Sequence, residues 1–217
     1  MLKPKAVVSW SGGKDSYMAL HRALARFDVQ ALLTMFTEDG ARSRSHGLRP
    51  EVVAQQAHLL DLRLVSGRGS WKNYEQEFKR VLRRLAGSGF SHVIFGDIFL
   101  DAHKAWVERV CRECRLEAVE PLWGEPTGSL FRQFIATGAE AQIVATKAML
   151  LDQHWLGRRL DAAMLSRLER LGVDPCGERG EYHTLVVGCP RMSARLELRE
   201  IDRLMHEGYW MLDLEVA

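Results

Sequence analysis

Short apolar runs alternate with amphipathic segments in the first half of the chain. Runs with the composition of buried strands occur at residues 5–10, 29–37, 62–65, 92–95 and 118–122. Between them, apolar residues recur at helical spacing in residues 14–27, 50–60, 73–85 and 102–115, with Asn73 as a candidate N-cap. Because strands and helices alternate, we expect an α/β fold with a doubly wound, Rossmann-like parallel sheet that carries helices on both faces.

The alternation weakens after residues 123–128, Trp-Gly-Glu-Pro-Thr-Gly, whose glycine and proline content is typical of a boundary. Helices are then expected at residues 129–137 and 160–171, and strands at residues 141–146, 185–187, 196–198 and 212–216. This weaker pattern predicts a smaller C-terminal α+β unit. We therefore expect one domain at residues 1–124 and a second at residues 125–217.

Composition narrows the class of protein. The chain has 217 residues, of which 47% are hydrophobic, enough for a substantial core. A formal net charge of +2 argues against polyanion binding, so nucleic acid is not an expected partner. The four cysteines do not suggest a disulfide scaffold, and neither a secretory signal nor a membrane-crossing run is apparent. We expect a cytoplasmic protein with no membrane partner.

Residues 9–16, Ser-Trp-Ser-Gly-Gly-Lys-Asp-Ser, lie between the first predicted strand and the first predicted helix. Gly12 and Gly13 permit a tight bend that exposes backbone N–H groups. The helix start adds partial positive charge and Lys14 adds a full charge, so this segment predicts a phosphate site. Ligands of parallel sheets lie beyond the carboxyl ends of the strands, which also places residues 96–97 at the site. The nucleotide-binding residues expected on these grounds are Ser9, Ser11, Gly12, Gly13, Lys14, Asp15, Ser16, Gly96 and Asp97.

The spacing of this segment excludes the commoner phosphate loops. A Walker A loop would need glycine where Val8 stands and Ser or Thr where Asp15 stands. The Gly-x-Gly-x-x-Gly fingerprint fails because Gly12 and Gly13 are adjacent. The string Ser-Gly-Gly-Lys-Asp-Ser instead resembles the pyrophosphate loop (PP-loop) of the ATP pyrophosphatases, which cleave ATP to AMP and pyrophosphate. That resemblance implies ATP as a cofactor and an adenine nucleotide alpha hydrolase-like sheet.

A second informative stretch is residues 172–184, where glycines, acids, cysteine, tyrosine and histidine crowd together. Its string Asp-Pro-Cys-Gly-Glu-x-Gly-Glu-Tyr-His-Thr, taken with the first loop, resembles the diphthine–ammonia ligase family. Residues 95–98, Phe-Gly-Asp-Ile, and residues 155–158, Trp-Leu-Gly-Arg, match the same family pattern. The resemblance covers residues 5–190 in order.

The resemblance implies a PP-loop ATP-binding domain followed by a substrate-binding domain, with ATP and Mg2+ as cofactors. The family adenylates a carboxylate and transfers ammonia to it, and its known substrate is diphthine, a modified histidine on elongation factor two. For this chain the carboxylate, whether a small molecule or carried by a translation factor, is left open. The ammonia source and the existence of a homodimer are left open as well.

The chemistry of this reaction assigns roles to residues. Lys14 and the backbone N–H groups of the loop are expected to stabilise the departing pyrophosphate. Glu178 and Glu181 are expected to bind ammonium and accept its proton, with His183 as a titrating neighbour. Asp15 and Asp97 are the candidate ligands of Mg2+. Asp15 could instead interact with the helix dipole as an acid in the first turn. Asp97 could instead contact the ribose or cap the next helix.

Further residues carry alternatives of their own. Cys111 and Cys114 have a spacing found in metal sites, but they share an apolar helical stripe, which favours simple burial. A metal there, completed by Cys176 or Cys189, would indicate a PP-loop enzyme that thiolates transfer RNA with a cysteine-held iron–sulfur cluster. An ATP-binding protein without catalysis is a third alternative, against which the crowded second stretch argues. The polar loop residues Arg42, Arg44 and His46 are candidates to close over phosphates or to meet an acidic partner. Trp155 and Arg158 are candidates to contact substrate.

Overall fold

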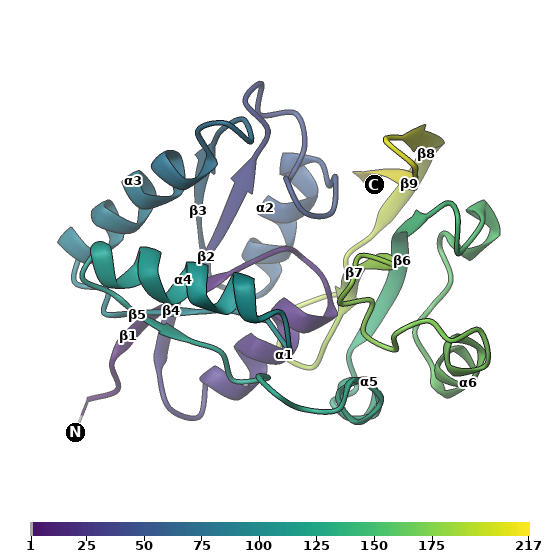
Figure 1. The fold of residues 1–217 in the computed structure, drawn as a ribbon, viewed down its shortest axis with the longest axis horizontal. Coiled ribbons are helices and arrows are strands. Elements are labelled where there is room, and N and C mark those ends of the chain that lie inside the picture. The colour runs from purple at the N-terminus through teal and green to yellow at the C-terminus, as the bar shows by residue number, and fades with distance from the viewer. Residues whose placement is uncertain (1) are drawn as a thin grey trace.

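The computed structural model describes residues 2–217. Its first half builds a five-stranded, all-parallel sheet in the order β3-β2-β1-β4-β5 (Figure 1). The strands are β1 (Lys5–Ser9), β2 (Asp28–Phe36), β3 (Arg63–Arg68), β4 (His92–Ile94) and β5 (Glu117–Val119). The connecting helices are α1 (Lys14–Ala23), α2 (Pro50–Leu59), α3 (Tyr74–Gly87) and α4 (Asp101–Glu113). The expected doubly wound α/β sheet is confirmed.

Two apolar layers hold the helices on opposite faces of this sheet. Val8 points into the core cluster that contains Leu20 of α1 and Val52 of α2. Its neighbour Val7 points the other way, into the cluster that holds α3 and α4 through residues such as Val81. Successive strand residues face opposite sides, so one continuous apolar run serves both layers.

Several element boundaries differ from the prediction. The first helix ends at Ala23, and the residues after it form turns that still bury Phe27. β3 extends to Arg68 through the glycine-rich segment because it pairs with β2 along its whole length. β5 ends at Val119 because its partner β4 offers only three paired positions. Asn73 occupies the N-cap position of α3, but its side chain accepts hydrogen bonds from Ser70 instead of capping the helix.

The second half forms an antiparallel sheet in the order β7-β6-β9-β8, as expected for an α+β unit. Its strands are β6 (Glu140–Lys147), β7 (Tyr182–Gly188), β8 (Leu198–His206) and β9 (Tyr209–Val216). It is accompanied by α5 (Thr127–Ala136), the short 3-10 helix η1 (Gln153–Trp155) and α6 (Ala162–Arg170). β8 was largely missed because it is an edge strand exposed over most of its length, so burial imposes no alternation on it.

The two halves share one hydrophobic core. Trp10 and Tyr17 from the first half belong to the same buried cluster as Phe131 and Val186 from the second. Figure 1 shows β6 and β7 lying beside α1 and α5. The division at residue 124 therefore separates two sheets that pack on each other, and its functional meaning stays a prediction. In the part of the chain that the structure describes, no helix combines the length and apolarity needed to cross a membrane.

An ion-paired carboxylate on β9 joins the halves at the other end of the interface. Asp213, with a side chain only 7% exposed, accepts hydrogen bonds from Arg49 Nε at 2.9 Å and Nη2 at 2.7 Å. Arg42 donates to the same carboxylate at 2.5 Å. Arg42 is therefore turned away from the predicted phosphate site, and the expectation that it closes over phosphates is wrong. The hydrogen bonds from Arg49 and Arg42 hold the pKa of Asp213 well below its usual range.

We predict that Asp213→Asn lowers the free energy of unfolding by about 2–3 kcal/mol at pH 7, because two guanidinium groups lose a buried anionic acceptor. The lowered pKa makes this stabilisation complete above about pH 4 and lost as the pH falls further. Urea unfolding of both proteins from pH 7 down to pH 3 measures the difference. Glu200→Gln, which breaks an exposed pair with Arg203, is the control and should cost under about 0.5 kcal/mol. Equal losses for the two variants would contradict the prediction.

Candidate functional site

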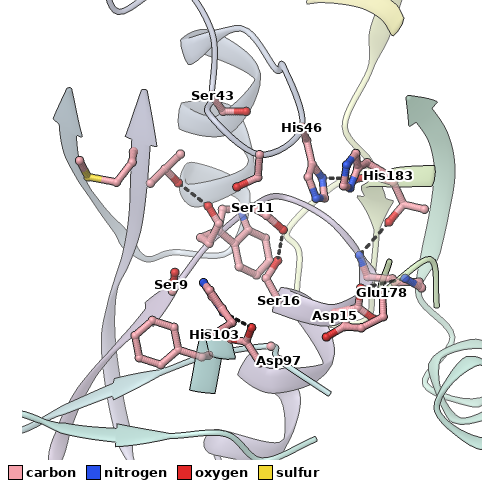
Figure 2. Close-up of a pocket in the computed structure, with 18 of the residues that line it drawn as sticks. Ser9, Ser11, Asp15, Ser16, Ser43, His46, Asp97, His103, Glu178 and His183 are labelled. Atoms are coloured by element: carbon pink, nitrogen blue, oxygen red, sulfur yellow. Dashed lines mark hydrogen bonds and ion pairs between the residues drawn. The ribbon is translucent and has the colours of Figure 1, made fainter. Parts of the chain in front are cut away.

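A cavity of about 330 Å³ opens at the carboxyl ends of β1, β2 and β4 and is closed on its far side by β7 (Figure 2). Residues of the predicted loop, of the segment after β4 and of the second informative stretch meet there. The predicted site residues that line the cavity are Ser9, Ser11, Lys14, Asp15, Ser16, Gly96, Asp97, Glu178 and His183. Gly12, Gly13 and Glu181 do not line it.

Hydroxyl groups organise the loop between β1 and α1. Ser16 Oγ donates to the carbonyl of Gly13 at 2.9 Å, and Ser11 Oγ lies 3.2 Å from Ser16 Oγ. Ser11 Oγ also accepts the N–H of Gly13 at 3.3 Å. Figure 2 shows both serines beside the cavity, at the start of α1. The loop therefore presents hydroxyls and a helix N-terminus to whatever occupies the cavity.

Close packing explains two glycines of the site. A Cβ at Gly96 would lie 2.8 Å from the carbonyl carbon of Asp15 and 3.0 Å from the backbone nitrogen of Ser16. A Cβ at Gly13 would lie 2.5 Å from the His46 ring and 3.0 Å from the carbonyl oxygen of Thr184. Any larger residue would push β4 or β7 away from the first turn of α1. Gly13 is therefore needed because it has no side chain: the His46 ring and β7 occupy the space that a Cβ would take, although Gly13 itself does not line the cavity.

Lys14 is buried, with 3% of its side chain exposed. Its Nζ donates to Asp15 Oδ2 at 2.8 Å and to the carbonyl of Cys176, and it lies 5.3 Å from the centre of the Tyr182 ring. Burial is the largest single effect and opposes the charge, but Asp15, Tyr182 and Cys176 together outweigh it and raise the pKa of Lys14 above its usual value. The ammonium is therefore permanent, and Asp15 is its counter-ion.

Asp97 follows Gly96 beside the start of α1 and is hydrogen bonded to His103 of α4 (Figure 2). This bond raises the pKa of His103 above its ordinary value. The helix-cap alternative for Asp97 is wrong, because Leu100 occupies the N-cap of α4. Sequence reasoning missed His103; the available signal was a histidine in the first turn of the helix that follows a strand-end aspartate.

Glu178 reaches the cavity from the second half of the chain. Its Oε1 accepts the N–H of Ile98 at 2.9 Å. Burial raises the pKa of Glu178 to about 7, and the nearby charges of Asp15 and Asp97 add to the effect. A carboxyl group that titrates near neutrality, held by a backbone hydrogen bond inside a cavity, is suited to accept and release a proton.

Glu181 does not join it. Its Oε2 accepts the N–H of Arg179 at 3.0 Å, so the carboxylate is hydrogen bonded within its own loop. The side chain is buried, but away from the cavity lining. The expectation that Glu181 faces the reacting groups is therefore wrong, and the interpretation as a self-bonded loop holds at this position.

His183 and His46 stack at 4.6 Å between ring centroids and face each other in Figure 2. His46 Nδ1 donates to the carbonyl of Thr184 at 2.8 Å. Burial lowers the pKa of His183 to about 4 and holds the pKa of His46 well below its usual value. Both rings are therefore neutral at pH 7, which corrects the expectation that His183 titrates there. The ring of His46 lies against Gly13 of the loop, and the expectation that it closes over phosphates stays a prediction.

Aromatic side chains form the wall of the cavity below α3 and α4. Tyr74, Phe78 and Trp106 pack on one another with ring centroids 5.5–5.9 Å apart. Glu75 fixes this wall by accepting from Trp106 Nε1 at 2.8 Å and from both terminal nitrogens of Arg109. Leu33, Met35 and Phe95 complete an apolar surface that no motif indicated.

The other predicted residues lie elsewhere. The guanidinium of Arg44 stacks on Trp71 at 3.8 Å. Trp155 and Arg158 do not reach the cavity; Arg158 lines a separate groove on the second sheet.

The cysteines of the metal alternative are buried core residues. Cys111 and Cys114 pack in the cluster under α3 and α4, whereas Cys176 and Cys189 belong to the other cluster. Burial raises the pKa of Cys111 to about 12, which keeps the thiol protonated. Within residues 2–217, no three or more His, Cys, Asp or Glu side chains are grouped as a metal site would need.

Family models match almost the whole chain. The diphthamide synthase N-terminal domain matches residues 4–118, and the diphthamide synthase C-terminal domain matches residues 126–217. The chain belongs to the diphthamide synthase family. The resemblance to diphthine–ammonia ligases drawn from the loop motifs is thereby confirmed.

Curated relatives carry the name diphthine–ammonia ligase. That of Schizosaccharomyces pombe is 27% identical over 222 residues, which cover 91% of this chain and 36% of the relative. Those of Mus musculus and Homo sapiens are 31% and 30% identical over 120 and 117 residues, covering 54% and 52% of this chain. These alignments span 45% and 44% of the two mammalian proteins, so the chain matches less than half of each relative.

One solved structure, described as a predicted subunit of tRNA methyltransferase from Methanocaldococcus jannaschii, aligns with a TM-score of 0.45 at 18% identity. The alignment covers 86% of this chain and 97% of that one.

We predict that Glu178→Gln raises the melting temperature more at pH 8 than at pH 5. The pKa of about 7 lies above the unfolded value near 4.5, so ionisation of Glu178 destabilises the folded state as the pH rises through this window. The gain at pH 8 should be about 1–2 kcal/mol after allowance for solvent screening. Thermal denaturation at both pH values measures it. Glu181→Gln, at a carboxylate outside the cavity lining, is the control. A flat pH profile for Glu178→Gln would refute the assignment.

Proposed function

We propose that this protein is an ATP-dependent amide ligase that adenylates a carboxylate, releases pyrophosphate and transfers ammonia to the acyl group. One observation carries the proposal: the hydroxyl-rich loop at residues 11–16 and the neutral-range carboxyl of Glu178 line the same cavity. Family membership adds the reaction class. Such a reaction needs a site that binds an anion and a group that accepts a proton. The loop and Glu178 are the candidates for these roles, and they line one cavity.

The cavity fits ATP in its charges and its shape. The N–H groups of the first turn of α1 have no partner within the helix, and the hydroxyls of Ser11 and Ser16 stand beside them. These groups and the permanent charge of Lys14 suit the phosphates. The aromatic and aliphatic wall of Leu33, Met35 and Phe95 suits a flat purine.

Asp15 and Asp97 fit a magnesium ion bound in the manner usual for nucleotide enzymes. In nucleotide enzymes, Mg2+ is usually bound by one or two carboxylates, and phosphates and water complete its coordination shell. Two carboxylates would therefore be enough. When bound, Mg2+ neutralises charge on the phosphate oxygens. Because Lys14 engages Asp15 Oδ2 and His103 engages Asp97 Oδ1, the remaining oxygen of each carboxylate is the atom available to Mg2+.

In the first half-reaction, a carboxylate oxygen of the substrate attacks the alpha phosphorus of ATP. The bond from that phosphorus to the bridging oxygen breaks, and pyrophosphate leaves. The protein's part is to stabilise the charge gathering on pyrophosphate with the loop N–H groups, the serine hydroxyls and Lys14. Lys14 sits at the base of the loop, 2.8 Å from Asp15, and contributes through its fixed charge.

In the second half-reaction, ammonia attacks the acyl carbon and AMP leaves, so that a C–N bond replaces the C–O bond. Ammonium must first lose a proton, and Glu178 near its midpoint at neutral pH is the group suited to take it. Asp97 adds negative charge that attracts the cation. His183 stays neutral and acts as a wall of the site through its stack with His46.

The substrate we propose is a carboxylate carried by a protein, as the relatives' name, diphthine–ammonia ligase, suggests. Diphthine on a translation factor is then the first candidate, and the setting is the cytoplasm. In this proposal residues 1–124 bind the nucleotide and residues 125–217 bind the substrate. The thiolation alternative has no supporting observation, because its cysteines are dispersed and buried.

We predict that pyrophosphate and AMP form when ATP, Mg2+, ammonium and diphthine-bearing elongation factor two are supplied together. Lys14→Ala should lower the rate at least about a hundredfold, as loss of a preorganised charge does. Glu178→Gln should spare the release of pyrophosphate but slow amide formation about a hundredfold. Pyrophosphate is followed by a coupled assay and the amide by mass spectrometry. ADP and orthophosphate as products, or wild-type rates in both variants, would overturn the proposal.

A further inference from the structure

The carbonyl of Gly12, at the bend of the loop, is held from outside the loop. It accepts the backbone N–H of Val186 in β7 at 2.9 Å and Gln56 Nε2 from α2 at 3.0 Å. Gly12 itself has a φ of +86°, a conformation that glycine adopts without strain. The bend is therefore pinned by residues that lie far away in the sequence.

All the hydrogen-bonding atoms of the Gln56 amide group take part in holding the bend. It is completely buried, its Nε2 donates a second bond to the carbonyl of Val186 at 2.7 Å, and its Oε1 accepts from Trp10 Nε1 at 2.9 Å. A buried amide that satisfies both donor hydrogens and its acceptor fixes its neighbours in position, because any shift leaves a buried polar group unpaired. Gln56 thus ties the end of β1, the loop and β7 together.

Thr184 of β7 supplies the cap that α1 lacks. The N-cap of α1 is Gly13, which has no side chain, and the N–H of Lys14 is bonded instead to Thr184 Oγ1 at 3.0 Å. These two residues are 170 positions apart in the chain. Thr184 is 2% exposed and lines the cavity, so the residue that caps α1 also borders the site.

We propose that Thr184 and Gln56 are positioning residues for phosphate binding, and that the loop at residues 11–16 becomes competent for it only when β7 is docked. The C-terminal sheet would then complete the nucleotide site as well as serve the substrate. Thr184 caps the helix end that faces the phosphates, and Gln56 holds the peptide of the bend. This inference rests on the proposed function, because it assumes that the loop binds a polyphosphate.

The full-length chain offers a matched set of variants. Thr184→Val keeps the shape and removes the acceptor, and Thr184→Ser keeps the hydroxyl. Thr146→Val is the control: Thr146 is completely buried in the neighbouring strand β6, and within residues 2–217 its Oγ1 has no hydrogen-bond partner. Gln56→Glu is an independent variant, which replaces a donor by an oxygen facing two carbonyls.

The experiment measures the dissociation constants of inorganic pyrophosphate and of ATP by calorimetry, well below the unfolding midpoint of every variant. Thr184→Val and Gln56→Glu should each bind both probes about tenfold more weakly, the effect of losing one hydrogen bond to a site that must stay ordered. Thr184→Ser should bind within about twofold of wild type, and Thr146→Val should match it. Rescue by serine separates positioning from mere packing.

Two results would overturn the inference. Either Thr184→Val binds pyrophosphate as Thr146→Val does, or the Thr184→Ser variant is no better than the valine. Lys14→Ala distinguishes this failure from that of the proposed function. If Lys14→Ala loses pyrophosphate binding while Thr184→Val retains it, the loop is the phosphate site but β7 does not position it. If Lys14→Ala also binds normally, the phosphate site itself is misplaced.

Discussion

The geometry of this protein depends on how one peptide group is held. The carbonyl of Gly12 accepts from two donors, Val186 N and Gln56 Nε2, and the next two N–H groups, those of Gly13 and Lys14, donate to Ser11 Oγ and Thr184 Oγ1. The two bonds to the Gly12 carbonyl join the bend to β7 and α2, so the loop, the parallel sheet and the antiparallel sheet have one common point. Close packing of Gly96 against α1 then leaves the loop no room to rearrange.

The same cavity has to satisfy opposite electrostatic demands. At the loop, Lys14 and a helix N-terminus create a positive region, with Asp15 keeping the buried ammonium paired. Beside it, Asp97 and Glu178 add negative charge, and His103 is hydrogen bonded to Asp97. Burial raises the pKa of Glu178, and the charges of Asp15 and Asp97 add to the effect. In the proposed reaction the first region serves pyrophosphate and the second serves ammonium.

Local sequence was enough where structure is local. The loop, the helix after it and the strand before it follow from glycine conformations and apolar periodicity within a few residues. The parallel direction of the strands in the first sheet followed from the alternation of strands and helices, whereas the order of the strands did not. Prediction failed where the deciding contact is distant: β8 has no buried face to impose a pattern, and β3 is prolonged by pairing with β2. The titration expected of His183 failed similarly, because its burial is set by contacts that the sequence does not display. Glu181 is different, since its partner, the N–H of Arg179, is only two residues away.

The amino-acid sequence by itself determined that a glycine loop follows the first strand of a doubly wound sheet, and through two motifs it determined the family. Those properties depend on residue type and short spacing, which the chain carries directly. The tertiary structure alone decided which acids reach the cavity, which histidines stay neutral and what caps α1. The reason is that burial and charged neighbours set the pKa of a side chain, and these depend on the folded structure. Hydrogen bonds such as that between Thr184 and Lys14 also join residues separated by most of the chain.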